Sequence, residues 1–139
     1  MELSSEQMLQ RGVDAHKEGN LEEAERIYCT ILASEPTHPD ANHNLGVMAV
    51  SVNKAELALP LFKAALEANP KIVQFWLSFI DALIKENQLE AAKEALEQAK
   101  KEGLVEEAFG ALKAQLEQAA PPGLSKPAFS DGGSPSNSN

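Results

Sequence analysis

The sequence predicts an all-α protein, an α-solenoid of about seven helices in antiparallel pairs with a disordered C-terminal tail. Three observations predict it. Ala, Leu, Glu and Lys recur while aromatic residues make up only 5% of the chain, which favours helix over sheet. A repeat of 34 residues indicates stacked units, and turn-forming residues divide each unit into two helices. At 139 residues the chain has room for one domain with a modest core.

The repeat is found by aligning the sequence with itself at an offset of 34 residues. The aligned sets are Ala24, Ala58 and Ala92; Tyr28, Phe62 and Leu96; Gly12 and Gly46; and Pro36 and Pro70. Small residues let two antiparallel helices approach closely, and the large ones fill the space between neighbouring pairs. Three units are predicted, at about 5–38, 39–72 and 73–106.

Each element of the first unit has a start and a stop signal. Ser4, with Gln7 three residues later, forms a capping box for the first helix. Gly19 suits the left-handed conformation that ends this helix, and Asn20 caps the second. Pro36 stops the second helix because proline cannot continue one.

The later units repeat this punctuation with two changes. Asn53 and Asn87 stand where the first unit has Gly19, and asparagine tolerates the left-handed conformation better than most residues. Pro70 ends the middle unit. Pro60 falls inside that unit's second helix, where it removes one backbone donor and is expected to kink or loosen the first turns.

A capping helix is predicted over about 105–119, after Gly103 ends the third unit. Its apolar face consists of Val105, Ala108, Phe109, Leu112 and Leu116. The opposite face is polar, as the last unit of a stack requires. We therefore expect a repeat domain over 1–120. Residues 121–139 are rich in Pro, Gly, Ser and Asn and are predicted to be a disordered tail or linker.

The spacing in HNLGVMA and ELALPLFKAALEANP, between residues 43 and 70, resembles the tetratricopeptide repeat. That family has Leu-Gly, an Ala, an aromatic residue, another Ala and a Pro at these separations. The resemblance covers about residues 5–119 and is best in the middle unit. The first unit has Arg11 before its glycine, and the third has Leu104 in place of the proline. The resemblance is specific for the fold and implies little about function, because such repeats serve many partners.

Composition and charge exclude several classes of protein. A net charge of −9 and a pI near 4.8 argue against binding to nucleic acid or an anionic membrane, which need clustered cations. One cysteine, Cys29, cannot form an intrachain disulfide, and its register predicts an exposed, incidental thiol. The first residues lack the pattern of a signal peptide, and the longest apolar run, FWLSFI, is too short to span a bilayer. We expect a cytoplasmic protein.

Catalytic and metal sites are not predicted. His16, His38 and His43 have no partner ligand at a suitable spacing and are interpreted as surface or groove residues. No phosphate-binding glycine loop and no nucleophile with a base is present, so neither a cofactor nor an enzymatic reaction is expected.

A partner-binding groove is predicted where the first helices of the three units line one surface of the stack. By register its residues are Leu9, Gln10, Val13, His16 and Lys17; His43, Asn44, Val47 and Val50; and Leu77, Ser78, Asp81, Ile84 and Lys85. Gln10, Asn44 and Ser78 form a polar ladder that can hydrogen-bond the main chain of a peptide. The aliphatic residues around them favour an extended peptide or an amphipathic helix of another protein.

Alternatives remain at this stage. The aliphatic groove residues could instead pack against neighbouring helices, or be covered by a second copy of the chain or by its tail. The chain could be the N-terminal targeting arm of a larger enzyme, such as a glycosyl- or sulfotransferase, or a self-assembling scaffold. The family branch that clamps chaperone carboxylates has Lys and Asn in the first unit, Asn in the second, and Lys and Arg in the third. This chain matches that set only at Asn44, with Leu9, Val13, Gln74 and Ser78 at the other places, so the resemblance does not extend to that activity.

Overall fold

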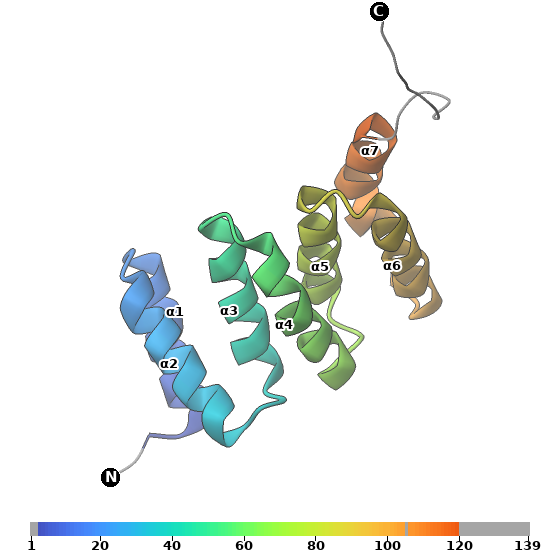
Figure 1. Cartoon of the computed structure of the whole chain (residues 1–139). Helices are drawn as coiled ribbons and strands as arrows, with labels where there is room; N and C mark the ends of the chain where they lie inside the picture. The colour runs from blue at the N-terminus through green and yellow to red at the C-terminus, as the bar shows by residue number, and fades with distance from the viewer. Residues whose placement is uncertain (1–2, 105, 120–139) are drawn as a thin grey trace, which may run out of the picture.

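The computed structural model describes residues 3–104 and 106–119, which form seven α-helices and one short 3-10 helix (Figure 1). The helices are α1 (Ser5–Lys17), α2 (Leu21–Ser34), α3 (Pro39–Ser51), α4 (Ala55–Ala68), α5 (Val73–Lys85), α6 (Leu89–Lys101) and α7 (Gly110–Ala119), with the 3-10 helix η1 (Glu106–Phe109) before α7.

These helices form antiparallel pairs stacked in the order of the sequence (Figure 1). The pairs are α1 with α2, α3 with α4, and α5 with α6. The first helices α1, α3 and α5 contact one another in turn, and α7 packs on α5 and α6. The prediction of an all-α solenoid of helix pairs is therefore confirmed.

The helices begin and end at the capping and turn residues that the sequence predicts. Ser4 and Gln7 form both bonds of the capping box, and the Asn20 side chain accepts from the backbone of the second helix. Gly19, Asn53 and Asn87 have φ of 81°, 67° and 58°, in the left-handed region. At the end of each first helix one N–H bonds a carbonyl five residues back: Asn20 to Ala15, Lys54 to Ala49 and Gln88 to Leu83, each at 2.8 Å. The three turns are thus built alike.

Close approach of the two helices in the first and second pairs depends on glycine. A Cβ added to Gly12 would lie 2.6 Å from Tyr28 Cε1, and one added to Gly46 would lie 2.4 Å from Phe62 Cε1. Both rings are at most 1% exposed. Each aromatic ring therefore occupies the volume that a side chain on the facing helix would need.

The third pair fills the same space differently. Ile80, fully buried, stands at the glycine position, and Leu96 replaces the aromatic ring; both belong to one core cluster. Trp76 joins this cluster and donates from Nε1 to the Pro70 carbonyl at 2.7 Å. A larger residue on one helix is thus matched by a smaller one on the other.

Pro60 lies inside α4, as predicted, without dividing it. At the start of the helix the Leu57 N–H bonds the Lys54 carbonyl three residues back. In α2 and α6 the corresponding first bonds span four residues, Ala24 to Asn20 and Ala92 to Gln88. The first turn of α4 is therefore tightened to the 3-10 type.

The predicted capping helix over 105–119 consists of the 3-10 turn η1 followed by α7. Phe109, Leu112 and Leu116 are buried and extend the core of the third pair, as their pattern predicted. Val105 and the predicted tail at 121–139 lie outside the described residues.

Candidate functional site

The predicted groove residues lie on α1, α3 and α5 and differ in exposure. Gln10, Lys17 and Lys85 are exposed; Leu9, Val13, His16, Asn44, Val47, Val50, Leu77, Ser78, Asp81 and Ile84 are half-buried; and His43 is buried. Most of these side chains are therefore only partly accessible to a ligand, because part of each one packs against the rest of the protein.

Packing explains the partial burial of the aliphatic members. Leu9 packs on the cluster around Tyr28, Val47 and Val50 on that around Phe62, and Leu77 and Ile84 on the cluster of the third pair. These side chains stabilise the stack as well as lining the surface. Truncating them would change stability and binding together, so they are poor positions for testing binding alone.

His43 lies deeper than a surface or groove histidine, which corrects the interpretation from the sequence. It is only 9% exposed, with its ring centroid 5.5 Å from that of Phe62 and 4.8 Å from that of Phe75. Its Nε2 lies 2.7 Å from Ser78 Oγ, a hydrogen bond that joins α3 to α5. Burial lowers the pKa of the imidazole below 6.5. His43 therefore orients Ser78 from beneath the groove.

Asn44 lies beside two buried groups on neighbouring helices. Burial raises the pKa of Tyr28, and the Asn44 amide partly opposes that rise; the same amide partly opposes the lowering of the pKa of His43. Among the described residues the Tyr28 hydroxyl nevertheless has no hydrogen-bond partner of ordinary length, so the amide is near it without forming a proper bond.

Two members of the predicted polar ladder, Gln10 and Ser78, already form hydrogen bonds within the chain. Gln10 donates from Nε2 to Asp14 Oδ1 at 3.0 Å, and Ser78 is bonded to His43. Asp81 forms an ion pair with Lys85 at 2.8 Å. A peptide would compete with or add to these bonds.

A hollow of about 330 Å³ lies at the α5 end of this surface. It is lined by Gln74, Leu77, Ser78, Asp81, Ala108, Ala111 and Leu112. The last three residues come from η1 and α7 and were not predicted as groove residues, because they lie beyond the repeats and have no register to place them. Their only sequence signal was the small and apolar face of the capping helix.

The part of the chain that the structure describes offers few groups suited to metal binding, nucleophilic catalysis or membrane insertion. No cluster of three or more His, Cys, Asp or Glu side chains could hold a metal ion there. Cys29 is exposed, as predicted, and partial burial together with Glu25 raises the pKa of its thiol, which disfavours a nucleophilic thiolate. None of the helices in 3–104 and 106–119 is both long enough and apolar enough to cross a membrane.

A family profile described as Tetratricopeptide repeat matches residues 49–116, from the end of α3 to α7. The chain belongs to the tetratricopeptide repeat family. The repeat signature of the first pair, with Gly12 against Tyr28, extends the same packing to α1 and α2.

Several solved structures share the fold. The first such domain of Spaghetti (RPAP3), bound to the HSP90 peptide SRMEEVD, is 20% identical with a TM-score of 0.72, over 84% of this chain and 94% of that one. Residues 41 to the end of MamA from Desulfovibrio magneticus RS-1 are 22% identical with a TM-score of 0.67, over 84% and 70%. The Sgt2 domain from Aspergillus fumigatus is 23% identical with a TM-score of 0.66, over 83% and 76%. The comparison with curated proteins found no match to this chain.

Proposed function

We propose that this tetratricopeptide domain is a non-catalytic interaction module that binds an extended or amphipathic peptide segment of a partner protein in the groove along α1, α3 and α5. The observation that carries the proposal is the hollow between α5 and α7, which adjoins the predicted groove residues Leu77, Ser78 and Asp81. A structurally similar domain, that of Spaghetti, binds a peptide, which supports the same class of ligand here.

The hollow offers both anchoring and orientation. Leu77 and Leu112 supply apolar surface to its lining, against which an aliphatic side chain of the ligand would be desolvated. Ser78 and Gln74 can give and accept hydrogen bonds with peptide main chain. Most of the binding energy would come from apolar burial, and the polar groups would set the direction of the peptide.

The ligand proposed here differs from the acidic peptide that the Spaghetti domain binds. A carboxylate-rich segment needs free cations, and this chain has a net charge of −9 with Leu9, Val13, Gln74 and Ser78 at the positions that clamp carboxylates in that branch. Lys85 in the groove is already paired with Asp81. We therefore propose an apolar, neutral or weakly basic segment.

A selection of random displayed peptides on the full chain tests this function. The blocking variant is Ala111→Glu, because Ala111 is exposed and lines the hollow. The matched control is Ala114→Glu, the same change at an exposed position of α7 that does not line the hollow. Placing an unpaired carboxylate against an apolar ligand should weaken binding by about 10- to 100-fold.

Enriched peptides should bind wild type and the Ala114 variant equally and the Ala111 variant much more weakly. Circular dichroism on both variants checks that helix content is unchanged. If the enriched peptides bind all three proteins with the same affinity, or if none is enriched, the groove is not the binding site.

The domain division belongs to the same proposal. We propose a repeat domain over 1–120 acting in the cytoplasm, with 121–139 as a linker or tail.

A further inference from the structure

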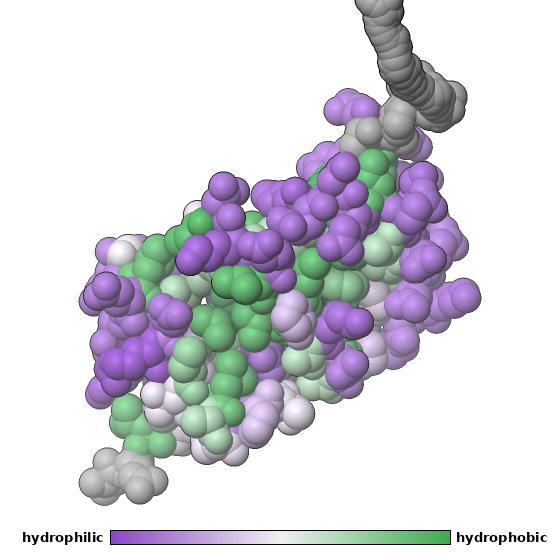
Figure 2. Space-filling view, viewed as in Figure 1, coloured by the Kyte–Doolittle hydropathy of each residue, from purple (hydrophilic) through white to green (hydrophobic). Residues whose placement is uncertain are grey.

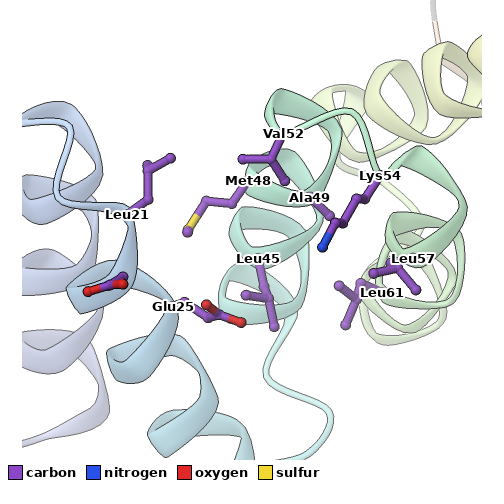
Figure 3. Close-up of a pocket in the computed structure, with 10 residues that line it drawn as sticks. Leu21, Glu25, Leu45, Met48, Ala49, Val52, Lys54, Leu57 and Leu61 are labelled. Atoms are coloured by element: carbon purple, nitrogen blue, oxygen red, sulfur yellow. The ribbon is translucent and has the colours of Figure 1, made fainter.

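A second groove lies away from the first, between α2, α3 and α4. It has a volume of about 330 Å³ and is lined by Leu21, Glu22, Glu25, Leu45, Met48, Ala49, Val52, Lys54, Leu57 and Leu61. Figure 3 shows these side chains converging from α2, α3 and α4 on one open space. In Figure 2 hydrophobic surface gathers over α3 and α4, between polar atoms of α2 and α6. The groove is therefore an apolar channel across the first two repeats.

The repeats themselves show that this apolar surface is not required by the fold. Val52 is 47% exposed and Leu57 is 55% exposed. The residues equivalent to Val52 are Glu18 and Glu86 in the other repeats. Leu57 likewise corresponds to Glu23 in the first repeat. Since the same turn and helix form with acidic residues at these positions, the aliphatic side chains here favour a ligand over a packing role.

The two walls of the groove carry opposite charge. Glu22 and Glu25 belong to α2, and Lys54 precedes α4. Figure 3 labels Glu25 and Lys54 on the two sides of the groove. All three are exposed, and none forms an ion pair within the described residues, whereas the neighbouring Glu23 is paired with Arg26. A ligand can therefore meet free carboxylates along one side and a free ammonium on the other.

We propose that this second groove binds an amphipathic α-helix of another protein. The ligand helix would carry aliphatic residues at positions i, i+3 or i+4, and i+7, with Lys or Arg on the flank facing Glu22 and Glu25 and an acidic residue facing Lys54. A helix satisfies its own backbone hydrogen bonds, which suits a channel whose lining is aliphatic except at the walls. This site is distinct from the groove on α1, α3 and α5, and it stands whether or not that groove binds a peptide.

A displayed library of 14-residue amphipathic helices, selected on the full chain, is the probe. The test variant is the double substitution Val52→Glu and Leu57→Glu, which copies the residues that the first repeat already has at these positions. The control is Ile72→Glu, which removes an aliphatic side chain that is 38% exposed outside the groove. Enriched helices should lose about 30-fold or more in affinity on the double variant and keep it on the control.

Charge reversal tests the orientation of the ligand. With Glu22→Lys and Glu25→Lys, binding of helices with a basic flank should fall by about tenfold, and helices with an acidic flank should bind better. The proposal is overturned if the selected helices bind the double variant as well as wild type, or if none is enriched. Two other occupants would also overturn it. One is a second copy of the chain, which would be indicated if wild type dimerises with rising concentration and the double variant does not. The other is the chain's own tail, which would be indicated if helices bind only after Leu124 and Phe129 are replaced by Glu.

Discussion

Gly46→Ala is expected to destabilise this fold although alanine is the better helix former. The added Cβ would lie 2.4 Å from Cε1 of Phe62, 2.8 Å from Cδ1 and 3.0 Å from Cζ. Carbon atoms normally rest about 3.5–4.0 Å apart, so the ring has to move. Phe62 is 1% exposed and lies against the His43 ring, so it has little space to move into.

The magnitude follows from two opposing effects. Overpacking of a core costs about 1–3 kcal/mol, and replacing a helical glycine with alanine returns about 0.8–1.0 kcal/mol. Because Phe62 has little space to move into, the cost should lie in the upper part of this range, at about 2–3 kcal/mol, and we expect a net loss of about 1–2 kcal/mol in the free energy of unfolding. That corresponds to a fall in Tm of roughly 3–10 °C for a domain of this size.

Urea unfolding followed by circular dichroism measures this loss, and a second substitution identifies its cause. The third pair combines Ile80 with Leu96, which shows that a side chain at the glycine position is tolerated when the facing residue is smaller. Phe62→Leu should therefore rescue Gly46→Ala, giving a coupling of about 1 kcal/mol in a double-mutant cycle.

Gly110→Ala is the matched control, because a Cβ at Gly110 would meet no atom of the described residues within 4 Å. It should leave stability unchanged or raise it by up to about 1 kcal/mol. A Gly46 variant as stable as wild type, or two substitutions whose effects simply add, would refute the argument from close packing.

Two further predictions concern buried and strained groups. Burial holds the pKa of His43 below 6.5, so the unfolded chain takes up this proton first; stability should be complete above pH 6.5 and fall as the pH is lowered. His43→Gln should flatten the decline in urea midpoint between pH 7 and pH 5, and parallel curves for the two proteins would exclude His43 as its source. Asn53, with φ of 67°, should give opposite results on two substitutions. Asn53→Gly should stabilise by up to about 1 kcal/mol and Asn53→Ala destabilise by about 1 kcal/mol in thermal unfolding, and effects of the same sign would contradict the left-handed turn.

Repeat register did not predict the burial of His43 in the candidate groove. Register placed His43 with Leu9 and Leu77 because the three are equivalent in the repeat. In the structure Phe75 covers His43, whereas the middle repeat has Ala41 at the position equivalent to Phe75. A pattern that treats the repeats as identical cannot show what a difference between neighbouring repeats does to a side chain lying between them.

The sequence by itself determined the local structure and the order of stacking. Helix ends depend on residues a few positions apart, such as Ser4 with Gln7, and on single residues that tolerate positive φ, such as Gly19 and Asn53. The 34-residue period in turn required consecutive pairs to cover one another's apolar faces.

Only the tertiary structure decided the depth of His43, the hollow between α5 and α7, and the channel across α2, α3 and α4. Each is formed by side chains that come together from two or more helices, and the hollow also includes residues of η1 and α7. Their exposure depends on how much volume the neighbouring helices leave, and that volume is set by packing between units rather than by the pattern within one.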